Sequence, residues 1–332
     1  MKVTRLPDAR PRPEGRAVAI GTFDGVHLGH REVIGDSDTV LTFDPHPMTV
    51  IRPEATPKLL TPFAIKRDLI AGLGVEELVI IPFDRAFAAL TAEEFVSGVL
   101  VERLGAGRVS VGENFRFGKG AGGDAGLLAA RPEFATRVVP LVEVTGETVS
   151  SSHIRGLVAA GEVATAAQFL GGPFLFEGEV VSGDRVGREL GMPTANLVPD
   201  DALVCPGHGI YAAWAHPAEP AASKMPSPAH PAEPAASKMP SPAHPAEPAA
   251  SGHPSAVSVG VRPTFETGRG LLVEAHLIGF EGDLYGRQLR IALLERMRGE
   301  KRFDSVDDLV EQMKRDVEVA REICERTSFR AA

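Results

Sequence analysis

The sequence predicts an α/β protein of two domains, in which a parallel sheet covered by helices is followed by an antiparallel β-barrel. In the first half, short β-rich runs alternate with segments of helical character, which is typical of parallel sheets. After Gly171-Gly172-Pro173 the strands follow one another with turns and little helix, which favours a barrel. The chain has 332 residues, 43% of them hydrophobic, which is enough for two cores.

We therefore expect a first domain at residues 1–171 and a second at residues 172–330. The strands expected in the first domain cover residues 18–20, 40–43, 78–81, 109–111 and 138–141. Two short helices, at residues 152–160 and 164–170, are expected to close this domain before the Gly-Gly-Pro break.

The strands expected in the second domain cover residues 174–181, 209–215, 256–260, 272–278 and 288–294. A closing helix is predicted from about residue 306 to 325, with Ser305 as its N-cap. Its apolar residues keep helical spacing: Val306, Leu309, Val310, Met313, Val317, Ala320, Ile323 and Cys324. We expect this stripe to seal the barrel rather than to bind a ligand.

Residues 216–251 form a tandem repeat of fourteen residues, His-Pro-Ala-Glu-Pro-Ala-Ala-Ser-Lys-Met-Pro-Ser-Pro-Ala. The repeat contains no aromatic residue and no apolar period, and its prolines favour extended conformations, so we expect a disordered insertion in a hairpin loop. The histidines His216, His230 and His244 could bind metal weakly, although known sites use more closely spaced ligands.

Composition excludes several classes of function. The net charge is −9 and no basic tract is present, which disfavours a nucleic-acid partner. No signal peptide and no apolar run of about 20 residues is seen, so we expect no membrane association. Cys205 and Cys324 lie far apart in the sequence, which favours free thiols and a cytoplasmic protein. The sequence does not define the oligomeric state.

The most specific motif covers residues 18–30, where an apolar strand leads into a turn with three glycines, His27 and His30. Glycines let backbone N–H groups approach an anion, and two histidines at i and i+3 share one face of the following helical turn. This pattern predicts a phosphate site. A pair of ordinary turn histidines, or a metal site completed by Asp44 and His46, are the alternatives.

Further motifs follow in both halves. They are Thr42-Phe-Asp-Pro-His-Pro47, Gly112-Glu-Asn-Phe-Arg-Phe-Gly118, Ser150-Ser-Ser-His-Ile-Arg155, the glycine-rich segment 183–196, Glu274 on an alternating strand, and Asp283-Leu-Tyr-Gly286. Taken singly, each has a structural explanation. Asn114 suits a turn, the serines suit a helix cap, and a lone carboxylate such as Glu274 is usually solvated.

Taken together and in this order, the motifs resemble the bifunctional bacterial riboflavin kinase and FAD synthetase (FMN adenylyltransferase) family. The resemblance covers nearly the whole chain outside residues 216–251. It implies a Rossmann-like HIGH-type nucleotidyltransferase domain followed by a riboflavin kinase barrel. It also implies that riboflavin and ATP give FMN and ADP, and that FMN and ATP then give FAD and pyrophosphate. The implied ligands are riboflavin, FMN and ATP, with Mg²⁺ as the metal.

The resemblance assigns residues to these roles. In the first half it implies catalysis by His27, His30 and Arg155, ATP binding by these three with Gly21, Phe23, Asp24, Ser151 and Ser152, and flavin binding by Phe43, His46, Pro47 and Asn114. In the second half it implies Glu274 as the catalytic base, ATP binding by Gly183, Gly187, Gly191, Thr194 and Asn196, and Mg²⁺ coordination by Thr194 and Asn196.

One departure from the family pattern concerns the segment between His30 and Val40, which has only nine residues. Nine helical residues span at most about 13 Å, near the lower bound for a parallel crossover. We therefore expect weak packing of this helix behind the sheet. Two alternatives follow from the resemblance and this departure: a riboflavin kinase whose adenylyltransferase half is impaired, and a flavin-binding protein without catalysis.

Overall fold

The computed structural model describes residues 1–182, 187, 190–218, 252–261 and 271–327. The chain folds as two compact units. The first comprises Met1–Leu60, Lys66–Ile154 and Phe169–Gly171, and the second comprises Thr61–Ile65, Arg155–Gln168 and Gly172–Ala332. None of the helices in the described ranges is long and apolar enough to cross a membrane.

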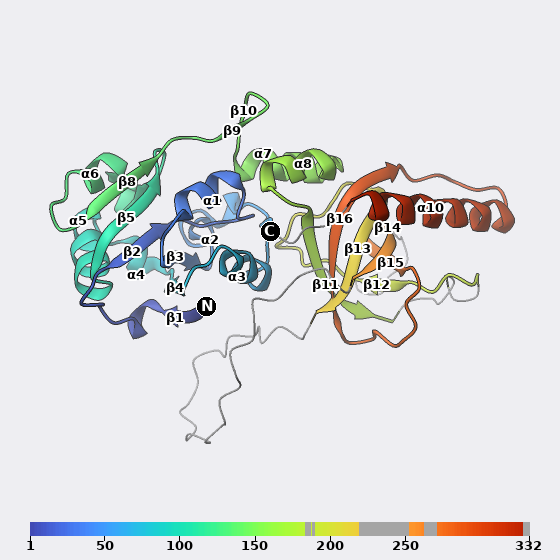
Figure 1. Cartoon of the computed structure of the whole chain (residues 1–332), viewed down its shortest axis with the longest axis horizontal. Coiled ribbons are helices and arrows are strands. Elements are labelled where there is room, and N and C mark those ends of the chain that lie inside the picture. The colour runs from blue at the N-terminus through green and yellow to red at the C-terminus, as the bar shows by residue number, and fades with distance from the viewer. Residues whose placement is uncertain (183–186, 188–189, 219–251, 262–270, 328–332) are drawn as a thin grey trace, which may run out of the picture. The chain divides into compact units, whose positions relative to one another are not determined.

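The first unit is built on a six-stranded parallel sheet, whose β2, β5 and β8 lie side by side in Figure 1. In spatial order its strands are β1 (Lys2–Arg5), β4 (Glu77–Pro82), β3 (Thr39–Asp44), β2 (Arg16–Ile20), β5 (Ala106–Gly112) and β8 (Ala135–Val139). The five expected strands are present, although the one expected at 138–141 lies at Ala135–Val139. The edge strand β1 was not predicted, because only Thr4 of its four residues is buried and its pairing with β4 defines it.

Helices and short turns connect these strands. The helices are α1 (Leu28–Ile34), α2 (Pro47–Ile51), α3 (Phe63–Gly72), α4 (Arg85–Ala88), α5 (Ala92–Glu94), a π-helix at Phe95–Arg103, α6 (Ala125–Ala129), α7 (Ser151–Ala160) and α8 (Val163–Leu170). Two small hairpins pair β6 (Arg116–Phe117) with β7 (Gly123–Asp124) and β9 (Glu143–Val144) with β10 (Glu147–Thr148). The helices expected at 152–160 and 164–170 are confirmed as α7 and α8.

The strand order reverses at β2, which lies between β3 and β5. The chain leaves β2 for β3 and β4 on one side and later returns to β5 on the other side. In open α/β sheets, ligands bind in the crevice outside the carboxyl ends of strands at such a switch point. The segments that follow β2, β3 and β5 therefore lie where this architecture binds ligands.

The short crossover helix α1 packs closely against the sheet. It ends at Gly35, whose φ of +48° suits glycine, and Val33 and Ile34 are buried. The buried hydroxyl of Ser110 on β5 donates to the carbonyl of Val33 at 2.6 Å. Arg137 on β8 likewise donates to the carbonyl of Glu32 at 3.0 Å. Neighbouring strands thus satisfy the helix-end carbonyls, and the expected weak packing is not seen.

The second unit contains a closed antiparallel barrel. Around the barrel the strands are β11 (Phe174–Val181), β12 (Ala195–Leu197), β15 (Leu271–Leu277), β14 (His253–Val261), β13 (Gly209–Ala218) and β16 (Gln288–Arg298). The five expected strands are confirmed, whereas β12 was missed because it has only three residues. Its pairing with β11 and β15 closes the barrel.

Strand β13 corrects the expected start of the repeat insertion. The first three repeat residues, 216–218, continue β13 and pair with β16, where His216 lies opposite Arg290. His216 is half-buried, and burial lowers its pKa. The rest of the predicted insertion, including His230 and His244, lies outside the described residues.

The closing helix α10 (Val306–Arg326) packs on β13, β14 and β16 (Figure 1). Ser305 caps it as expected, accepting the N–H of Asp308 at 3.1 Å. Ala320, Ile323 and Cys324 are buried, and the Cys324 thiol lies 3.3 Å from the carbonyl oxygen of Ala213. The C-terminal half of the stripe therefore covers the barrel. Val306, however, is 62% exposed and does not seal it.

Candidate active sites

The first candidate site is the turn that follows β2, residues 21–27. Phe23, Gly25 and Val26 all have positive φ, of +49°, +90° and +42°. A side chain on Gly25 would place its Cβ 2.8 Å from a methyl carbon of Leu60, so glycine is required there. The carboxylate of Asp24, which is 1% exposed, accepts the Leu60 N–H with both oxygens at 2.9 and 3.1 Å. The turn is thus a tightly held backbone loop.

His27 and His30 stand together at the end of this turn. His27 is the N-cap of α1, and its Nδ1 accepts the N–H of His30 at 3.2 Å. The two rings stack with centroids 3.5 Å apart, and Phe23 meets the His30 ring edge to face at 5.3 Å. His27 is buried, while His30 is half-buried. The predicted juxtaposition of the two imidazoles is therefore present.

The start of α7 meets the same turn. The hydroxyl of Ser151 donates to the carbonyl of Asp24 at 2.9 Å. Ser152 is exposed, and Arg155 follows one helical turn after Ser151 and is half-buried. The structure brings Ser151 to the residues Gly21 to His30, which supports its selection from the sequence.

The residues selected for flavin binding lie at the end of β3 or in the segments after β3 and β5, the two neighbours of β2. Half-buried Phe43 packs edge to face on Phe83, with ring centroids 5.7 Å apart. His46 caps α2 by accepting the Met48 N–H, and Pro47 is the first residue of that helix. Asn114 is exposed in the turn after β5. Phe43 is the last residue but one of β3, and the other three follow the carboxyl ends of β3 and β5 beside the switch point.

The metal alternative for this turn finds no support in the part of the chain that the structure describes. No three His, Cys, Asp or Glu side chains there are arranged to hold a metal ion. Asp44 also faces another partner, because its carboxylate attracts the ammonium group of Lys66. The described residues therefore add no further His, Cys, Asp or Glu ligand to the histidine pair.

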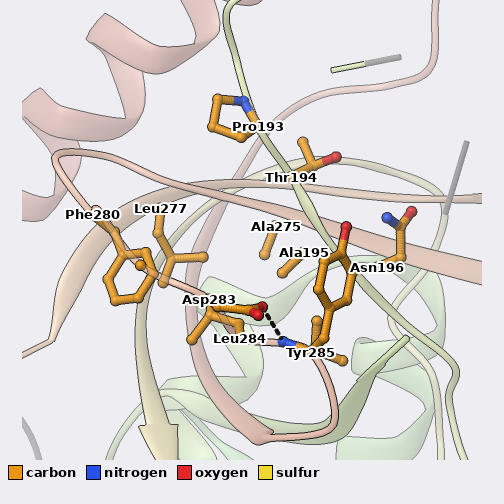
Figure 2. Close-up of a pocket in the computed structure, with 12 residues that line it drawn as sticks. Pro193, Thr194, Ala195, Asn196, Ala275, Leu277, Phe280, Asp283, Leu284 and Tyr285 are labelled. Atoms are coloured by element: carbon orange, nitrogen blue, oxygen red, sulfur yellow. Dashed lines mark hydrogen bonds between the residues drawn. The ribbon is translucent and has the colours of Figure 1, made fainter. Parts of the chain in front are cut away.

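The second candidate site is a hollow of about 360 Å³ in the barrel (Figure 2). Thr194, the residue before β12, and Asn196, within β12, both line this hollow. Because side chains alternate between the two faces of a strand, these two point to the same side. Apolar and aromatic residues line the rest: Val180, Leu277, Phe280, Leu284 and Tyr285. Figure 2 shows the Tyr285 ring rising from the turn in which the Asp283 carboxylate accepts its N–H at 3.0 Å.

Asn196 and Thr194 carry side-chain oxygens, the donor atoms that a divalent cation such as Mg²⁺ takes. Asn196 is 6% exposed, and its buried amide oxygen has no hydrogen-bond partner among the described residues. A buried oxygen left in this state is costly unless a ligand satisfies it. Mg²⁺ prefers oxygen ligands and keeps several waters, so a site with few protein ligands suits it. The residues present therefore fit this ion.

A neighbouring hollow of about 320 Å³ contains Glu274, with Thr194 lining both hollows. Glu274 lies on β15 opposite Asn196 on β12, and it shares its side of the strand with His276. His276 donates to the carbonyl of Pro193 at 2.9 Å. The carboxylate thus lies beside the Thr194–Asn196 strand, as its selection as a base requires.

The wall of this second hollow corrects an expectation about α10. Leu309, Met313 and Val317 line the hollow instead of sealing the barrel. The two halves of the helix therefore differ, because the C-terminal half is buried against the barrel and the N-terminal half lines a hollow with apolar side chains.

Two residues of this hollow were missed from the sequence. Arg298 on β16 donates to Asp316 on α10, with contacts of 2.6 to 3.2 Å, and Asp316 is 7% exposed. The sequence did contain a signal for this pair. Asp316 interrupts the apolar stripe of the helix at a position that faces the barrel. A charge at such a position indicates a buried partner.

Of the glycines selected in the kinase segment, Gly187 lines the second hollow and Gly191 has a φ of +77°. The carbonyl of Gly187 accepts the N–H of Met192 at 2.7 Å. Gly183 lies outside the described residues.

Comparisons with known proteins match the two halves of the chain to two family models. A family model described as riboflavin kinase matches residues 170–324, and one described as FAD synthetase matches residues 9–153. The bifunctional riboflavin kinase/FMN adenylyltransferase of Escherichia coli strain K12 is 34% identical over 93% of each chain. The protein of the same description from Pseudomonas fluorescens is 30% identical over 99% of each chain.

Among solved structures, one titled as a macrolide-efflux protein from Streptococcus pneumoniae is similar over nearly its whole length. It is 27% identical, with a TM-score of 0.78, and the match covers 97% of this chain and 99% of that chain. The likeness shows that both units of the fold occur together in another protein.

Proposed function

Because the chain belongs to the bifunctional riboflavin kinase/FMN adenylyltransferase family, we propose that it converts riboflavin to FMN in the barrel and FMN to FAD in the parallel-sheet domain. ATP is the co-substrate of both reactions, and ADP and pyrophosphate are the respective second products. We place the boundary between the two domains at residues 171 and 172. The observation that carries the proposal is the gathering of the motif residues at one site in each unit.

In the barrel, the two hollows meet at Thr194, which suits a reaction between two ligands. We assign ATP to the hollow lined by Asn196 and Tyr285, and riboflavin to the hollow lined by Glu274 and the apolar wall of α10, so that Gly187, expected to bind ATP, lies on the riboflavin side. A flat aromatic ring suits the apolar side chains of that wall. The ribityl hydroxyl would then lie near Glu274 and the terminal phosphate near Thr194.

Glu274 acts as the general base of this reaction. It accepts the proton of the ribityl 5′-hydroxyl as the oxygen attacks the γ-phosphorus of ATP. Thr194 and Asn196 would hold Mg²⁺, which neutralises charge on the β- and γ-phosphates when bound. His276 donates to the Pro193 carbonyl. It thereby orients the strand that carries Thr194 and Asn196, the two residues proposed to hold Mg²⁺.

In the parallel-sheet domain, the protein positions two nucleotides and stabilises charge. His27 and His30 donate to the triphosphate of ATP, whose α-phosphorus is attacked by a phosphate oxygen of FMN. Arg155 and Ser152 on α7 add further donors, and Ser151 holds the Asp24 carbonyl of the turn. Phe43, His46, Pro47 and Asn114 surround the flavin, beside the carboxyl ends of β3 and β5.

The protein is proposed to act in the cytoplasm, where its two cysteines stay reduced; no disulfide joins them among the described residues. The test of function incubates the purified protein with riboflavin, ATP and Mg²⁺ and separates riboflavin, FMN and FAD by chromatography over time. FMN followed by FAD is the expected result. FMN alone would retain only the kinase, and flavin binding without either product would overturn both catalytic assignments.

A further inference from the structure

Lys66 on α3 is a buried cation at the turn after β2. It is 7% exposed, and its ammonium group donates to the carbonyl of Thr22 at 3.0 Å. The hydroxyl of Thr42 on β3 donates to the same carbonyl at 3.2 Å. A carbonyl within the turn is therefore held by side chains from two other elements.

The two hydrogen bonds to the Thr22 carbonyl act on a strained stretch of backbone. Phe23 and Val26 have φ of +49° and +42°, which side chains other than glycine seldom adopt. The peptide unit is planar, so fixing the Thr22 carbonyl also fixes the Phe23 N–H in the opposite direction. The contacts of Lys66 and Thr42 thus set the orientation of a backbone group in the proposed phosphate turn.

Lys66 also balances charge at this position. Burial lowers the pKa of Lys66, while the attraction of the Asp24 and Asp44 carboxylates opposes that shift. The Asp24 carboxylate is 1% exposed and belongs to the turn itself. Asp24 is one of the residues that the family resemblance assigns to ATP binding, yet without a nearby cation its negative charge would repel a triphosphate through a medium of low dielectric constant.

We propose that Lys66 is a positioning residue for adenylyl transfer, which holds the Thr22 peptide and offsets the charge of Asp24 so that the turn accepts a triphosphate. The inference rests on the proposed adenylyltransferase function of this turn. Lys66 does not touch the reacting atoms in this assignment, because its ammonium group is directed to the turn backbone.

The test compares Lys66→Met with the intact protein in both reactions. Methionine keeps much of the length and removes the charge and the donor. We expect kcat/KM for FAD formation from FMN to fall about 100-fold, as for a displaced binding group, with a raised KM for ATP. The kinase reaction of the same chain reports on folding and should be unchanged. Lys58→Met removes an exposed lysine of the same unit and serves as the matched control.

A rescue experiment separates charge balance from simple loss of packing. In the double variant Lys66→Met/Asp24→Asn, the carboxylate charge is removed together with its counter-charge, and the amide oxygen can still accept the Leu60 N–H. We expect the double variant to reverse part of the rise in the KM for ATP that Lys66→Met causes. No recovery would overturn the charge-balancing role.

Thr42→Val provides a milder test if Lys66→Met fails to fold. It removes one of the two donors to the Thr22 carbonyl, and we expect a smaller fall in FAD formation with the kinase unchanged. If the intact protein forms FAD and both Lys66→Met and Thr42→Val match it, the inference about Lys66 is wrong. If the intact protein forms no FAD, the proposed adenylyltransferase function itself fails.

Discussion

The imidazole rings of His27 and His30 lie nearly parallel, 14° apart in plane and 3.5 Å between centroids. His27 has a structural task as well, because its Nδ1 accepts the N–H of His30 and caps α1. The two histidines therefore form one unit in which the backbone of the second depends on the side chain of the first.

Variants of His27 can separate these two tasks. His27→Ala removes both the ring and the cap, whereas His27→Asn keeps a cap acceptor and removes the ring. We expect both to lower the rate of FAD formation about 100-fold, since each lacks the imidazole that donates to the triphosphate. Only His27→Ala should lose about 1 kcal/mol of unfolding free energy in denaturant titrations. Normal FAD formation by His27→Asn would reduce the role of His27 to capping.

Glu274→Gln tests the assignment of the kinase base. The amide fills the same space and cannot accept the hydroxyl proton, so FMN formation should fall by about 10² to 10⁴. FAD formation from added FMN should not change, because that reaction belongs to the other domain. Glu179→Gln alters an exposed glutamate of the same barrel and should leave both rates intact. Equal loss in both reactions would point to misfolding instead.

Asn196 tests the proposed metal site. Asn196→Leu removes the buried amide oxygen, whereas Asn196→Asp keeps an oxygen at the same position. Loss of one ligand worth about 1.4 kcal/mol raises the half-saturating Mg²⁺ concentration of the kinase about tenfold. We expect this rise for Asn196→Leu and a smaller change for Asn196→Asp. A Mg²⁺ titration that is identical for all three proteins would remove Asn196 from the metal site.

Ser110→Ala tests how the short crossover is held. The change leaves the buried carbonyl of Val33 without its 2.6 Å partner and should reduce the unfolding free energy by about 1–3 kcal/mol. FAD formation should weaken more than FMN formation, because the helix that Ser110 holds carries His30. Ser97→Ala is the control, because it removes a surface hydroxyl that donates to the carboxylate of Glu93. Unchanged denaturation of Ser110→Ala would show that the crossover stands without this bond.

Glu77 makes the stability of the first unit depend on pH in the acid range. Burial by itself would raise the pKa of Glu77, but hydrogen bonds from Arg16 and Thr4 outweigh it and lower the pKa to about 2. Since the folded pKa lies below the unfolded value of about 4.3, the stabilisation is present above that value. It is lost as the pH falls toward 2.

Glu77→Gln should therefore be less stable than the parent chain at pH 7, by about 3–5 kcal/mol for a broken buried ion pair. The difference in unfolding free energy between the two proteins should shrink as the pH falls from about 4.3 toward 2. Thermal unfolding of both proteins at several pH values in this range measures the difference in unfolding free energy. A difference that stays constant with pH would exclude the ionised Glu77 as its source.

Most of the strands could be predicted from the sequence because their apolar residues stand in compact runs. The strands at Val40–Phe43 and Leu78–Ile81 could be predicted without tertiary information. Strands β1 and β12 could not, because only their pairing with other strands defines them. Only one residue of β1 is buried, and β12 has three residues, so neither leaves a pattern that is visible without its partner strands. The start of the insertion was misplaced for the same reason, since pairing with β16 extends β13 to Ala218.

The candidate sites divide in the same way. His27, Ser151, Thr194 and Glu274 were found because glycines, histidines and a strand carboxylate stand in recognisable order. Lys66 and the Arg298–Asp316 pair were missed because each works through a partner far away in the sequence. A single lysine within a helix carries no pattern that distinguishes a buried contact from a solvated charge.

The sequence by itself determined the two-domain α/β and barrel architecture, the helical closing stripe and the two groups of chemistry-bearing residues. Hydrophobic periodicity and glycine placement are local properties, so they can be read along the chain. Only the tertiary structure decided that the strand order reverses at β2, that Asn196 faces Glu274, and that half of α10 lines a hollow. These relationships depend on strand pairing and helix packing between distant segments, and such long-range contacts leave no periodic trace in the sequence.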